Sequence, residues 1–540
     1  MVLAGDRLKR GYGHWPLATS HWPLASIQSF APSPSGWGLF LRSLSALNGV
    51  TITAPANARI VISLLSNFPI FPCVQPLERE EFDLLVGIKF HGEFGPPTPS
   101  ERKGHMKKTL KLTVVAGVVA LAATVLSTTG ATAAAPNCAD FKQFGSFANH
   151  PTVKVFAGIR DPEATVMTGV FAHFTACTGI KIAYEGTDQF ETLLPVRVKG
   201  GNAPDIAIIP QPGLVATMVA TGKAVPVTAK VLSNINKYYN PAWKTFTTVG
   251  GKVYGSPFGA SSKSLVWYSP AQFTKLGVKI PTTWDEMTAV AAKFKAAGVT
   301  PWCAGIESGA ATGWPATDWT EELVLRDLGP DLYNQWWQGK LKFSSPQILG
   351  ELNKLSAWLG TKDQVGDLQS VATRKFQDAG VPGLKDGTCG MLQQASFYSS
   401  MFPAGTTFGP SGDANAFYLP PTNTKFGKPI EGAGEFPVAF SKKPEVGAVQ
   451  DYFSSPVYAT ERAKLGGWTS ANNGVPLSAY TDPVLKVVAQ SLQAKSGAIV
   501  FDASDLMPTA VNGAFWKEIT KYFAEGKSMK DVAAAIDTNW

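Results

Sequence analysis

The segment TVKVFAGIRDPEATVMTGVFAHFTACTGIKIAYEGTDQFETLLPVRVKGGNAPDIAII, residues 152–209, alternates short apolar runs with longer helical patterns. The short runs read as strands at 152–156, 181–184 and 205–209, and the longer ones as helices at 163–177 and 189–199. The run GGNAP at 200–204 breaks the second helix before the last strand. Regular alternation of strand and helix predicts an α/β fold, with an open, mostly parallel sheet and helices on both faces.

The loops that follow the predicted strands indicate where a ligand would bind. In open α/β sheets, ligands bind beyond the carboxyl ends of the strands. Two such loops are EGTDQ at 185–189 and PQPG at 210–213. Their candidate ligand-binding residues are Glu185, Thr187, Gln189 and Gln211. For Asp188 the alternative is a cap on the helix that begins at Phe190.

Upstream of this segment, the run MKKTLKLTVVAGVVALAATVLSTTGATAAAPNC at 106–138 has the parts of a bacterial secretory signal. Lysines form its basic start, and the apolar run at 112–126 is too short to cross a bilayer. We predict a signal peptide at 106–133 with cleavage after Ala133, and an internal buried helix is the alternative. The residues before Cys138 lack a lipobox, so no lipid anchor is predicted.

Residues 1–105 mix Trp, Pro, Ser and apolar clusters without a sustained helical or strand period. Export machinery normally engages a signal at the extreme N-terminus. We therefore interpret this stretch as the product of a start codon assigned too early, and predict no fold for it. A genuine N-terminal extension is the alternative.

The charge balance changes when it is recounted after the predicted signal. The whole chain holds 48 Lys and Arg against 40 Asp and Glu, a net charge of +8. Residues 1–135 hold 12 of the basic and 7 of the acidic residues, which leaves 36 against 33, or +3. This balance gives no case for a nucleic-acid partner. Only His150 and His173 remain, which is poor material for a histidine metal cluster or a Ser/His/Asp site.

Four of the five cysteines follow the predicted signal, at positions 138, 177, 303 and 389. An even number of cysteines in an exported chain predicts two disulfides. Four cysteines allow three connectivities, and we favour nearest neighbours in sequence, Cys138 with Cys177 and Cys303 with Cys389. Reduced, buried thiols are the alternative.

Several motifs, in order along the chain, carry a resemblance to a known family. They are TGIKIAYEGTDQFETLLPVRVKGGNAPDIAIIPQPG at 178–213, GGKVYGSPFGASSKSLVWYSP at 250–270, PTTWDEM at 281–287, TPWCAGIESGAATGWPATDW at 300–319, EGAGEFPVAFSKKPEV at 431–446 and SDLMPTAVNGAFW at 504–516. Together they resemble an extracellular solute-binding protein of a carbohydrate ABC importer, and most closely its α-glucoside-binding, maltose-binding-like branch. The resemblance covers residues 140–540 and none of 1–105.

The resemblance implies a periplasmic-binding-protein-like fold for the chain after the signal, residues 134–540. This fold has two α/β lobes with the ligand in the cleft between them. Lobe 1 would take approximately 140–262 and 432–474. Lobe 2 would take approximately 269–431, together with C-terminal helices in 475–540. The chain would cross between the lobes near 261–268.

Recognition of a sugar needs flat aromatic faces for the ring and planar polar groups for its hydroxyls. Twelve of the fifteen tryptophans lie after the predicted signal. Trp314, in a Gly-Trp-Pro loop, is the leading candidate for stacking. Phe397 and Trp468 follow it, and Trp516 occupies a position that resembles an aromatic of the maltose-binding cleft. A core position is the alternative for Trp516.

Further polar candidates come from strand ends and from glycine- or proline-rich loops. They are Glu307, Gln394, Glu435 and Asp505. Lys263 is also a candidate because it resembles a position of the family where the chain crosses between lobes, and a salt bridge between lobes is its alternative. A surface acid or helix cap is the alternative for each acidic candidate. Gln211 stands where the maltose-binding relatives carry an aromatic residue and an acid nearby. We therefore expect a small α-linked disaccharide or short oligosaccharide rather than a long maltodextrin.

These features predict the exported binding component of an ABC importer, which captures an α-glucoside or related saccharide by lobe closure and delivers it to the membrane permease subunits. We expect a monomer in the periplasm or outside the cell, associated with the cell surface. No catalytic residue, metal or cofactor is expected. No GxxxxGK[ST] nucleotide loop was found among the motifs.

Two other functions are compatible with an exported, sugar-binding chain. A glycoside hydrolase needs two carboxyls about 5–9.5 Å apart. The pairs Glu321-Glu322 and Asp285-Glu286 do not provide this, because adjacent residues on a helix point away from each other. Both pairs are predicted to be acids at helix starts. A carbohydrate-binding surface protein that does not close around its ligand is the other alternative.

Overall fold

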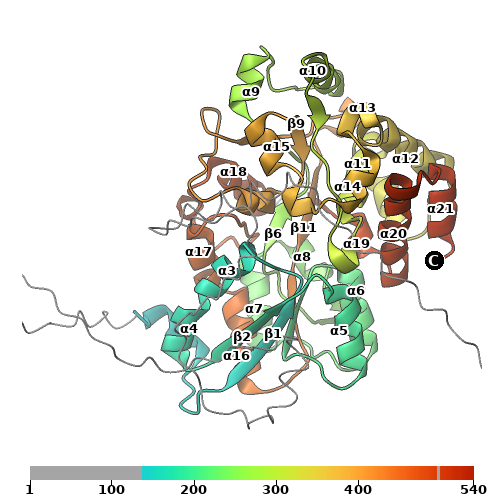
Figure 1. The fold of residues 1–540 in the computed structure, drawn as a ribbon. Coiled ribbons are helices and arrows are strands. Elements are labelled where there is room, and N and C mark those ends of the chain that lie inside the picture. The colour runs from blue at the N-terminus through green and yellow to red at the C-terminus, as the bar shows by residue number, and fades with distance from the viewer. Residues whose placement is uncertain (1–136, 495–498) are drawn as a thin grey trace, which may run out of the picture. The chain divides into compact units, whose positions relative to one another are not determined.

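The computed structural model describes residues 137–494 and 499–540 (Figure 1). The predicted signal peptide, its cleavage site and the upstream segment 1–105 lie outside these residues. The described residues all belong to one unit, 124–540. Within them, no helix combines the length and the apolar character needed to cross a membrane.

The first sheet has the strand order β12-β3-β1-β2 and confirms the predicted α/β fold. Its strands are β1 (Thr152–Ala157), β2 (Lys181–Gly186), β3 (Ile206–Ile209) and β12 (Phe436–Ala439). β1 runs parallel to β2 and β3, whereas β12 pairs antiparallel with β3. All four residues of β3 are buried, as expected for a central strand covered by helices. β12 comes from the segment 432–474 that was expected to return to lobe 1.

Seven helices lie in the two segments of the chain, 152–238 and 436–464, that contain or follow these strands. They are α3 (Glu163–Gly169), α4 (Phe171–Thr178), α5 (Phe190–Lys199), α6 (Pro212–Ala220), α7 (Ala229–Tyr238), α16 (Pro444–Ser454) and α17 (Pro456–Lys464). The single helix predicted at 163–177 was wrong, because the chain forms two helices that meet at Val170. Gly169, a poor helix former, ends the first. The suggested Asp188 cap was also wrong, since Gln189 is the N-cap residue of α5 and makes no side-chain cap.

The second sheet has the strand order β10-β7-β9-β8. Its strands are β7 (Leu265–Tyr268), β8 (Thr300–Trp302), β9 (Cys389–Gln393) and β10 (Asn415–Tyr418). The helices of this region are α9 (Pro270–Lys275), α10 (Trp284–Ala296), α11 (Trp314–Trp337), α12 (Pro346–Leu359), α13 (Lys362–Val365), α14 (Leu368–Thr373) and α15 (Val381–Asp386). Thr283 and Glu286 form a capping box at the start of α10, which confirms the helix-start prediction there.

The helix-start prediction was wrong for Glu321 and Glu322. Both lie inside α11, seven and eight residues after its first residue, with 0% and 1% of their surface exposed. Charged side chains at such positions need a partner. Arg326 pairs with Glu322, and the Tyr333 hydroxyl donates to Glu321 at 3.1 Å. The sequence pattern alone did not reveal that this acidic pair is internal.

A third sheet, of order β13-β11-β6, lies where the chain passes from one of the larger sheets to the other. Its strands are β6 (Ala260–Ser262), β11 (Ile430–Gly434) and β13 (Ile499–Phe501). β6 leads into β7, and β11 leads into β12. Figure 1 shows β6 and β11 between the sheet of β1 and β2 and the strand β9. The remaining helices are α8 (Pro241–Thr245), α18 (Pro483–Leu492), α19 (Ala503–Leu506), α20 (Thr509–Glu525) and α21 (Met529–Asp537), and β4 (Thr248–Val249) pairs with β5 (Lys252–Val253).

Both predicted disulfides are present. Cys138 is bonded to Cys177, and Cys303 to Cys389, with Cα atoms 5.3 Å apart in each pair. The first ties the segment before β1 to α4. The second joins the end of β8 to the start of β9. Bonds of this kind typically stabilise a fold by about 2–4 kcal/mol, mainly by restricting the unfolded chain.

Candidate ligand-binding cleft

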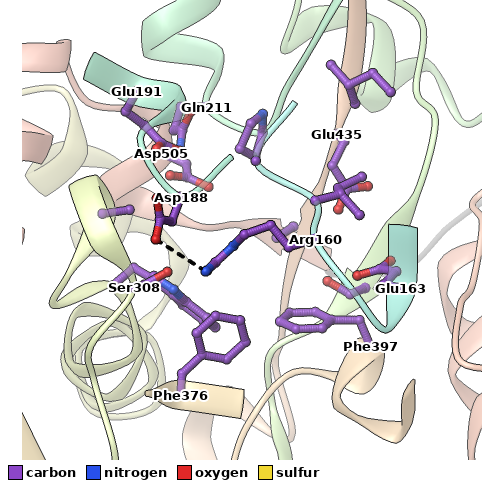
Figure 2. A pocket seen from close by; sticks show the side chains of 18 of the residues that line it. Arg160, Glu163, Asp188, Glu191, Gln211, Ser308, Phe376, Phe397, Glu435 and Asp505 are labelled. Carbon is purple, nitrogen blue, oxygen red and sulfur yellow. Dashed lines mark hydrogen bonds and ion pairs between the residues drawn. The ribbon is translucent and has the colours of Figure 1, made fainter. Parts of the chain in front are cut away.

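A cavity of about 180 Å³ lies where loops of the first and second sheets meet the third sheet. Its lining includes the residues that follow β1, β2 and β3, together with the start of α11, the end of β11 and the turn around α19. Figure 2 shows side chains from these elements converging on one space. The carboxyl ends of the parallel strands therefore contribute to the cavity, as expected for an open α/β sheet.

One side of the cavity is aromatic. The rings of Trp314 and Phe376 meet edge to face with centroids 5.0 Å apart, and the centroid of Phe397 lies 6.0 Å from that of Trp314. Trp314 is the first residue of α11, directly after Gly313 in the left-handed region. It is only partly buried, so part of the indole is available to a ligand. Trp516, from α20, also lines the cavity.

Another part of the lining is polar and comes from the first sheet. The Gln211 amide donates to Glu191 at 3.2 Å, while the buried Gln211 Oε1 atom accepts no hydrogen bond within the described residues. Burial raises the pKa of Glu191. Arg160 pairs with Asp188 across 3.6 Å, as Figure 2 shows. These amide, carboxyl and guanidinium groups have the planar, bidentate geometry that suits ligand hydroxyls.

Two further carboxyls, those of Glu163 and Glu435, line the same cavity and are half-buried. Within the described part of the chain, neither is hydrogen-bonded or ion-paired to another side chain. Burial and the neighbouring Glu163 raise the pKa of Glu435 to about 7. Burial also raises the pKa of Glu163, and Arg462 opposes this. Gly259 makes room here, because a Cβ atom at that position would lie 2.2 Å from Glu435 Oε2.

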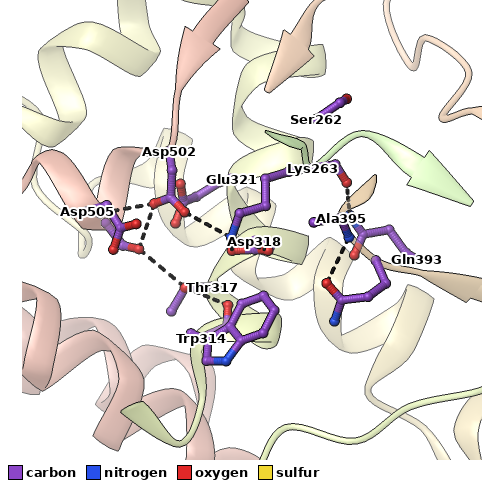
Figure 3. A network of polar contacts seen from close by, with 12 residues as sticks. Ser262, Lys263, Trp314, Thr317, Asp318, Glu321, Gln393, Ala395, Asp502 and Asp505 are labelled. Atoms are coloured by element: carbon purple, nitrogen blue, oxygen red, sulfur yellow. Dashed lines mark hydrogen bonds and ion pairs between the residues drawn. The ribbon is translucent and has the colours of Figure 1, made fainter. Parts of the chain in front are cut away.

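Lys263 sits at the exit of β6 and contacts three separate segments (Figure 3). Its Nζ atom lies 2.9 and 2.8 Å from the two carboxylate oxygens of Asp318 and 3.2 Å from Asp502 Oδ2. The same atom lies 4.5 Å from the ring centroid of Trp314, within cation–π range. Lys263 lines the cavity and also makes the salt bridge that was its alternative role.

More acids surround this ion pair than Lys263 can neutralise. Burial raises the pKa of Asp318 to about 8, and it raises the pKa values of Glu321, Glu431 and Asp505 well above their usual range. Carboxylate oxygens of Asp318, Glu321 and Asp502 lie within 4.8 Å of one another, a spacing that also occurs in metal sites. Lys263 Nζ already lies against two of these three groups. We therefore assign the charge balance to Lys263 and to protons on the carboxyls.

The cavity brings together eight of the thirteen residues predicted to bind ligand. They are Thr187, Gln211, Lys263, Trp314, Phe397, Glu435, Asp505 and Trp516. Glu185, Gln189, Glu307, Gln394 and Trp468 are not part of its lining. Contact between these residues and a ligand stays a prediction.

Local contacts explain why most of the five remaining predicted residues lie outside the lining of the cavity. Glu185 pairs with Arg197 of α5 at 2.5 Å. Glu307 accepts from the backbone N–H of Gly309 at 2.8 Å, and Gln394 accepts from the N–H of Ala395 at 2.7 Å. Trp468 is 4% exposed and packs edge to face on neighbouring rings. Side chains that already have hydrogen-bond, ion-pair or packing partners within the fold contribute to its stability.

Sequence reasoning missed several residues of the lining. Arg160 and Glu163 follow β1, so the rule of strand carboxyl ends would have found at least Arg160. Glu191 lies in the first turn of α5, where acidic residues are common at helix starts. Phe376 stands in a short 3₁₀ turn at Phe376–Asp378, for which the sequence gives no signal.

Comparisons with known proteins agree with this architecture. The family described as bacterial extracellular solute-binding protein matches residues 159–449. The osmoprotective compounds-binding protein GgtB of Synechocystis is 36% identical over 374 residues, which cover 68% of this chain and 87% of the relative. The α-glucosides-binding periplasmic protein AglE of Rhizobium meliloti is 32% identical over 403 residues, which cover 72% of this chain and 87% of the relative.

Solved structures show the same fold at lower sequence identity. The bacterial solute receptor AcbH, described as preferring β-D-galactopyranose, has a TM-score of 0.63 at 18% identity, covering 72% of this chain and 98% of that one. The maltose-bound T. maritima MalE3 has a TM-score of 0.56 at 16% identity, covering 72% and 98%. The relatives are named as binding proteins. The chain belongs to the bacterial extracellular solute-binding protein family.

Proposed function

We propose that the protein is the exported binding component of an ABC importer and that its ligand is an α-glucoside or a related short oligosaccharide. The observation that carries this proposal is the composition of the cavity. Trp314, Phe376 and Phe397 offer aromatic surface, and Gln211, Glu191 and the other polar residues offer planar hydrogen-bonding groups. A pyranose presents C–H faces and a rim of hydroxyls, which match these two kinds of surface.

The proposed mechanism is closure of two lobes around the ligand. Contacts across the cavity support it: the Ala310 N–H, in the 3₁₀ turn Gly309–Ala311, donates to the Asp188 carbonyl at 2.8 Å. The hydroxyls of Thr217 and Thr509 lie 2.8 Å apart on another pair of elements, α6 and α20. A ligand that touches both sides would stabilise the closed form by its differential affinity for that form. No covalent step is required.

The name of one relative supports a small, hydroxyl-rich ligand. One relative is named for α-glucosides and another for osmoprotective compounds. In the proposed function the closed protein presents its ligand to the permease subunits in the membrane. We place the protein outside the cytoplasm, as the name of its family and the predicted signal peptide suggest, and we propose that it acts as a monomer.

A ligand screen on the protein from Ala134 tests the proposal. We expect maltose, trehalose or another α-glucoside to raise the melting temperature and to bind with one-to-one stoichiometry in calorimetry. The panel includes β-glucosides, polyols, amino acids and peptides as other ligand classes. A rise with one of these classes and none with any sugar would contradict the proposal. Release of free glucose from the bound sugar would instead support the hydrolase alternative.

A further inference from the structure

The lining of the cavity has an excess of carboxyl groups over cations. Seven carboxyl groups line it against two cations, namely Asp161, Glu163, Asp188, Glu191, Glu435, Asp502 and Asp505 against Arg160 and Lys263. Both cations are already engaged. Arg160 pairs with Asp188, and Lys263 pairs with Asp318 and Asp502. A ligand carboxylate or phosphate would therefore meet acids without a free cation in the lining.

Glu163 and Glu435 are the two acids of the lining that most lack a partner. They come from the start of α3 and from the residue between β11 and β12, and Figure 2 shows both on the same side of the cavity. Asp188 and Asp502, in contrast, have cationic partners, and Asp161 accepts from Thr165 at 3.0 and 2.6 Å. The open side of the Glu163 and Glu435 carboxyls is the cavity itself.

The protein supplies only partial compensation around these two carboxyls. Arg462, on α17, lowers the pKa of both carboxyls, but its guanidinium donates to the Gly466 carbonyl at 2.6 Å and lies over the Trp468 ring. The other titratable groups that face the pair are Lys263, Tyr184, Tyr458 and Asp161. Two like charges in a partly desolvated site repel each other unless a proton or a cation joins them.

Neutral and charged ligand groups satisfy such a pair differently. A sugar hydroxyl donates one hydrogen bond and brings no charge, whereas an ammonium group has three N–H donors and a positive charge. Hydrogen bonds between ionised partners are shorter and stronger than those between neutral partners. We propose that Glu163 and Glu435 form a subsite for a protonated amine, so that the favoured ligand is an amino sugar or a saccharide containing one. This inference rests on the proposed saccharide-binding function.

A matched set of ligands tests the charge of the subsite. The probes are glucose, the 2-, 3- and 6-amino derivatives of glucose, N-acetylglucosamine and glucuronate, measured by calorimetry at neutral pH. We expect at least one amino derivative to bind about tenfold or more tightly than glucose, the factor expected for one charge-assisted hydrogen bond. N-acetylglucosamine, which has no charge, should lose this advantage, and glucuronate should bind more weakly than glucose. If no amino derivative exceeds glucose by tenfold, the inference is overturned.

Variants test whether the preference for an amine depends on Glu163 and Glu435. Glu163→Gln and Glu435→Gln keep the shape of each side chain and remove its charge. Each should reduce the preference for the amine over glucose by about tenfold. Glu525→Gln, at the exposed end of α20, makes the same charge change away from the cavity and should leave the preference unchanged. A preference that persists in both cavity variants would assign the amine to another part of the lining and overturn the inference.

The outcome also separates this inference from the proposed function. Neutral α-glucosides that bind as tightly as their amino derivatives would leave the proposed function intact and overturn the amine subsite. The absence of binding by every saccharide, amino derivatives included, would overturn both. The wild-type ligand series decides the question even where a variant loses its fold, which its thermal unfolding would show.

Discussion

Trp314 combines a structural position with a proposed role in ligand binding. It starts α11, it lines the cavity, and the Lys263 Nζ atom lies 4.5 Å from its ring centroid, in cation–π range. The rings of Phe376 and Phe397 also lie against it, with centroids 5.0 and 6.0 Å away. A ring held on several sides loses little further entropy on binding, which favours its use as a stacking surface.

We expect Trp314→Ala to weaken sugar binding about 10- to 100-fold, because it removes a large aromatic contact surface. Trp314→Phe keeps a flat ring and should recover part of this loss. Calorimetric titration with the best sugar of the screen measures both. Equal affinities for the alanine variant and the wild type would show that the ligand does not stack on this ring.

Lys263 gives a prediction about stability. Lys263→Met leaves Asp318 and Asp502 without their buried cation, and breaking such a pair typically costs about 3–5 kcal/mol. Lys263→Met combined with Asp318→Asn should recover part of the free energy of unfolding, measured in urea. Lys295→Met breaks an exposed pair with Asp363 and serves as the control, with little expected change. Similar losses in both lysine variants would contradict the role assigned to burial.

For single residues, the sequence predicted a place in the cavity correctly where a side chain comes directly after a strand. Gln211 and Thr187 were found in this way, and both line the cavity. Glu185 was taken on the same ground, but it pairs with Arg197, one helix away, instead of facing the cavity. The direction of a side chain depends on its neighbours in space, and the sequence alone does not show them.

At the scale of helices, strands and turns, glycines determine how closely some elements approach one another. Gly309 opens the 3₁₀ turn Gly309–Ala311 with a φ of 59°, in the left-handed region. A Cβ atom there would lie 2.3 Å from the Asp188 carbonyl oxygen, so only glycine permits this approach. The turn meets the loop before α5 through the bond from Ala310 to Asp188. The proposed closure would therefore be sensitive to one added methyl group at this contact.

Gly309→Ala should therefore disfavour the closed form and weaken ligand affinity by about tenfold or more, since reaching that form would cost additional free energy. Gly277→Ala is a matched control, because Gly277 has a φ of 60° and open space around its Cβ position. Both variants carry the backbone strain, but only the first meets another element. X-ray scattering with ligand would show incomplete closure for Gly309→Ala alone. Equal affinity of the two variants would contradict the contact's role in closure.

The sequence predicted elements well where their contacts are local. The alternation over 152–209 gave β1, β2, β3 and α5 to within two residues at each end. It could not give β12, which joins the same sheet from more than two hundred residues later. It also missed the break between α3 and α4, because both halves keep a helical pattern. Pairing between distant strands depends on the fold as a whole.

For the molecule as a whole, the buried acids around Lys263 set how stability depends on pH. Asp318 has a pKa raised to about 8, and those of Glu321, Glu431 and Asp505 are raised well above their usual range. In the unfolded chain these groups release their protons near pH 4. Between pH 4 and the raised pKa values, the folded protein binds more protons than the unfolded chain. The free energy of unfolding therefore falls as pH rises through this range.

We expect a higher melting temperature and a larger free energy of unfolding at pH 5.5 than at pH 8. Acids with lowered pKa, such as Asp327, act in the opposite sense but only in more acidic solution. Glu431→Gln mimics the protonated side chain and should reduce the slope of stability against pH. Denaturant titrations at several pH values measure the slope. Stability that increases from pH 5.5 to pH 8 would contradict this assignment.

The family resemblance predicted the architecture of the whole molecule better than composition or periodicity did. It supplied the expectation of two lobes with a cleft, and the fold comparisons support that class of fold. The lobe boundaries stay a prediction. Composition correctly pointed to two disulfides, but it gave no sign of the acids buried around Lys263, since Asp and Glu read as surface residues in any sequence pattern.

The three-stranded sheet β13-β11-β6 has a consequence for the synthesis of the protein, because its strands come from distant parts of the sequence. Arg160 and Glu163 are made well before Asp505 and Trp516, which line the same cavity. A nascent chain that stops before β13 contains β1, β2 and β3 but only part of the binding surface. A ligand can therefore contact the complete set of lining residues only after the segment that follows β13 has been made.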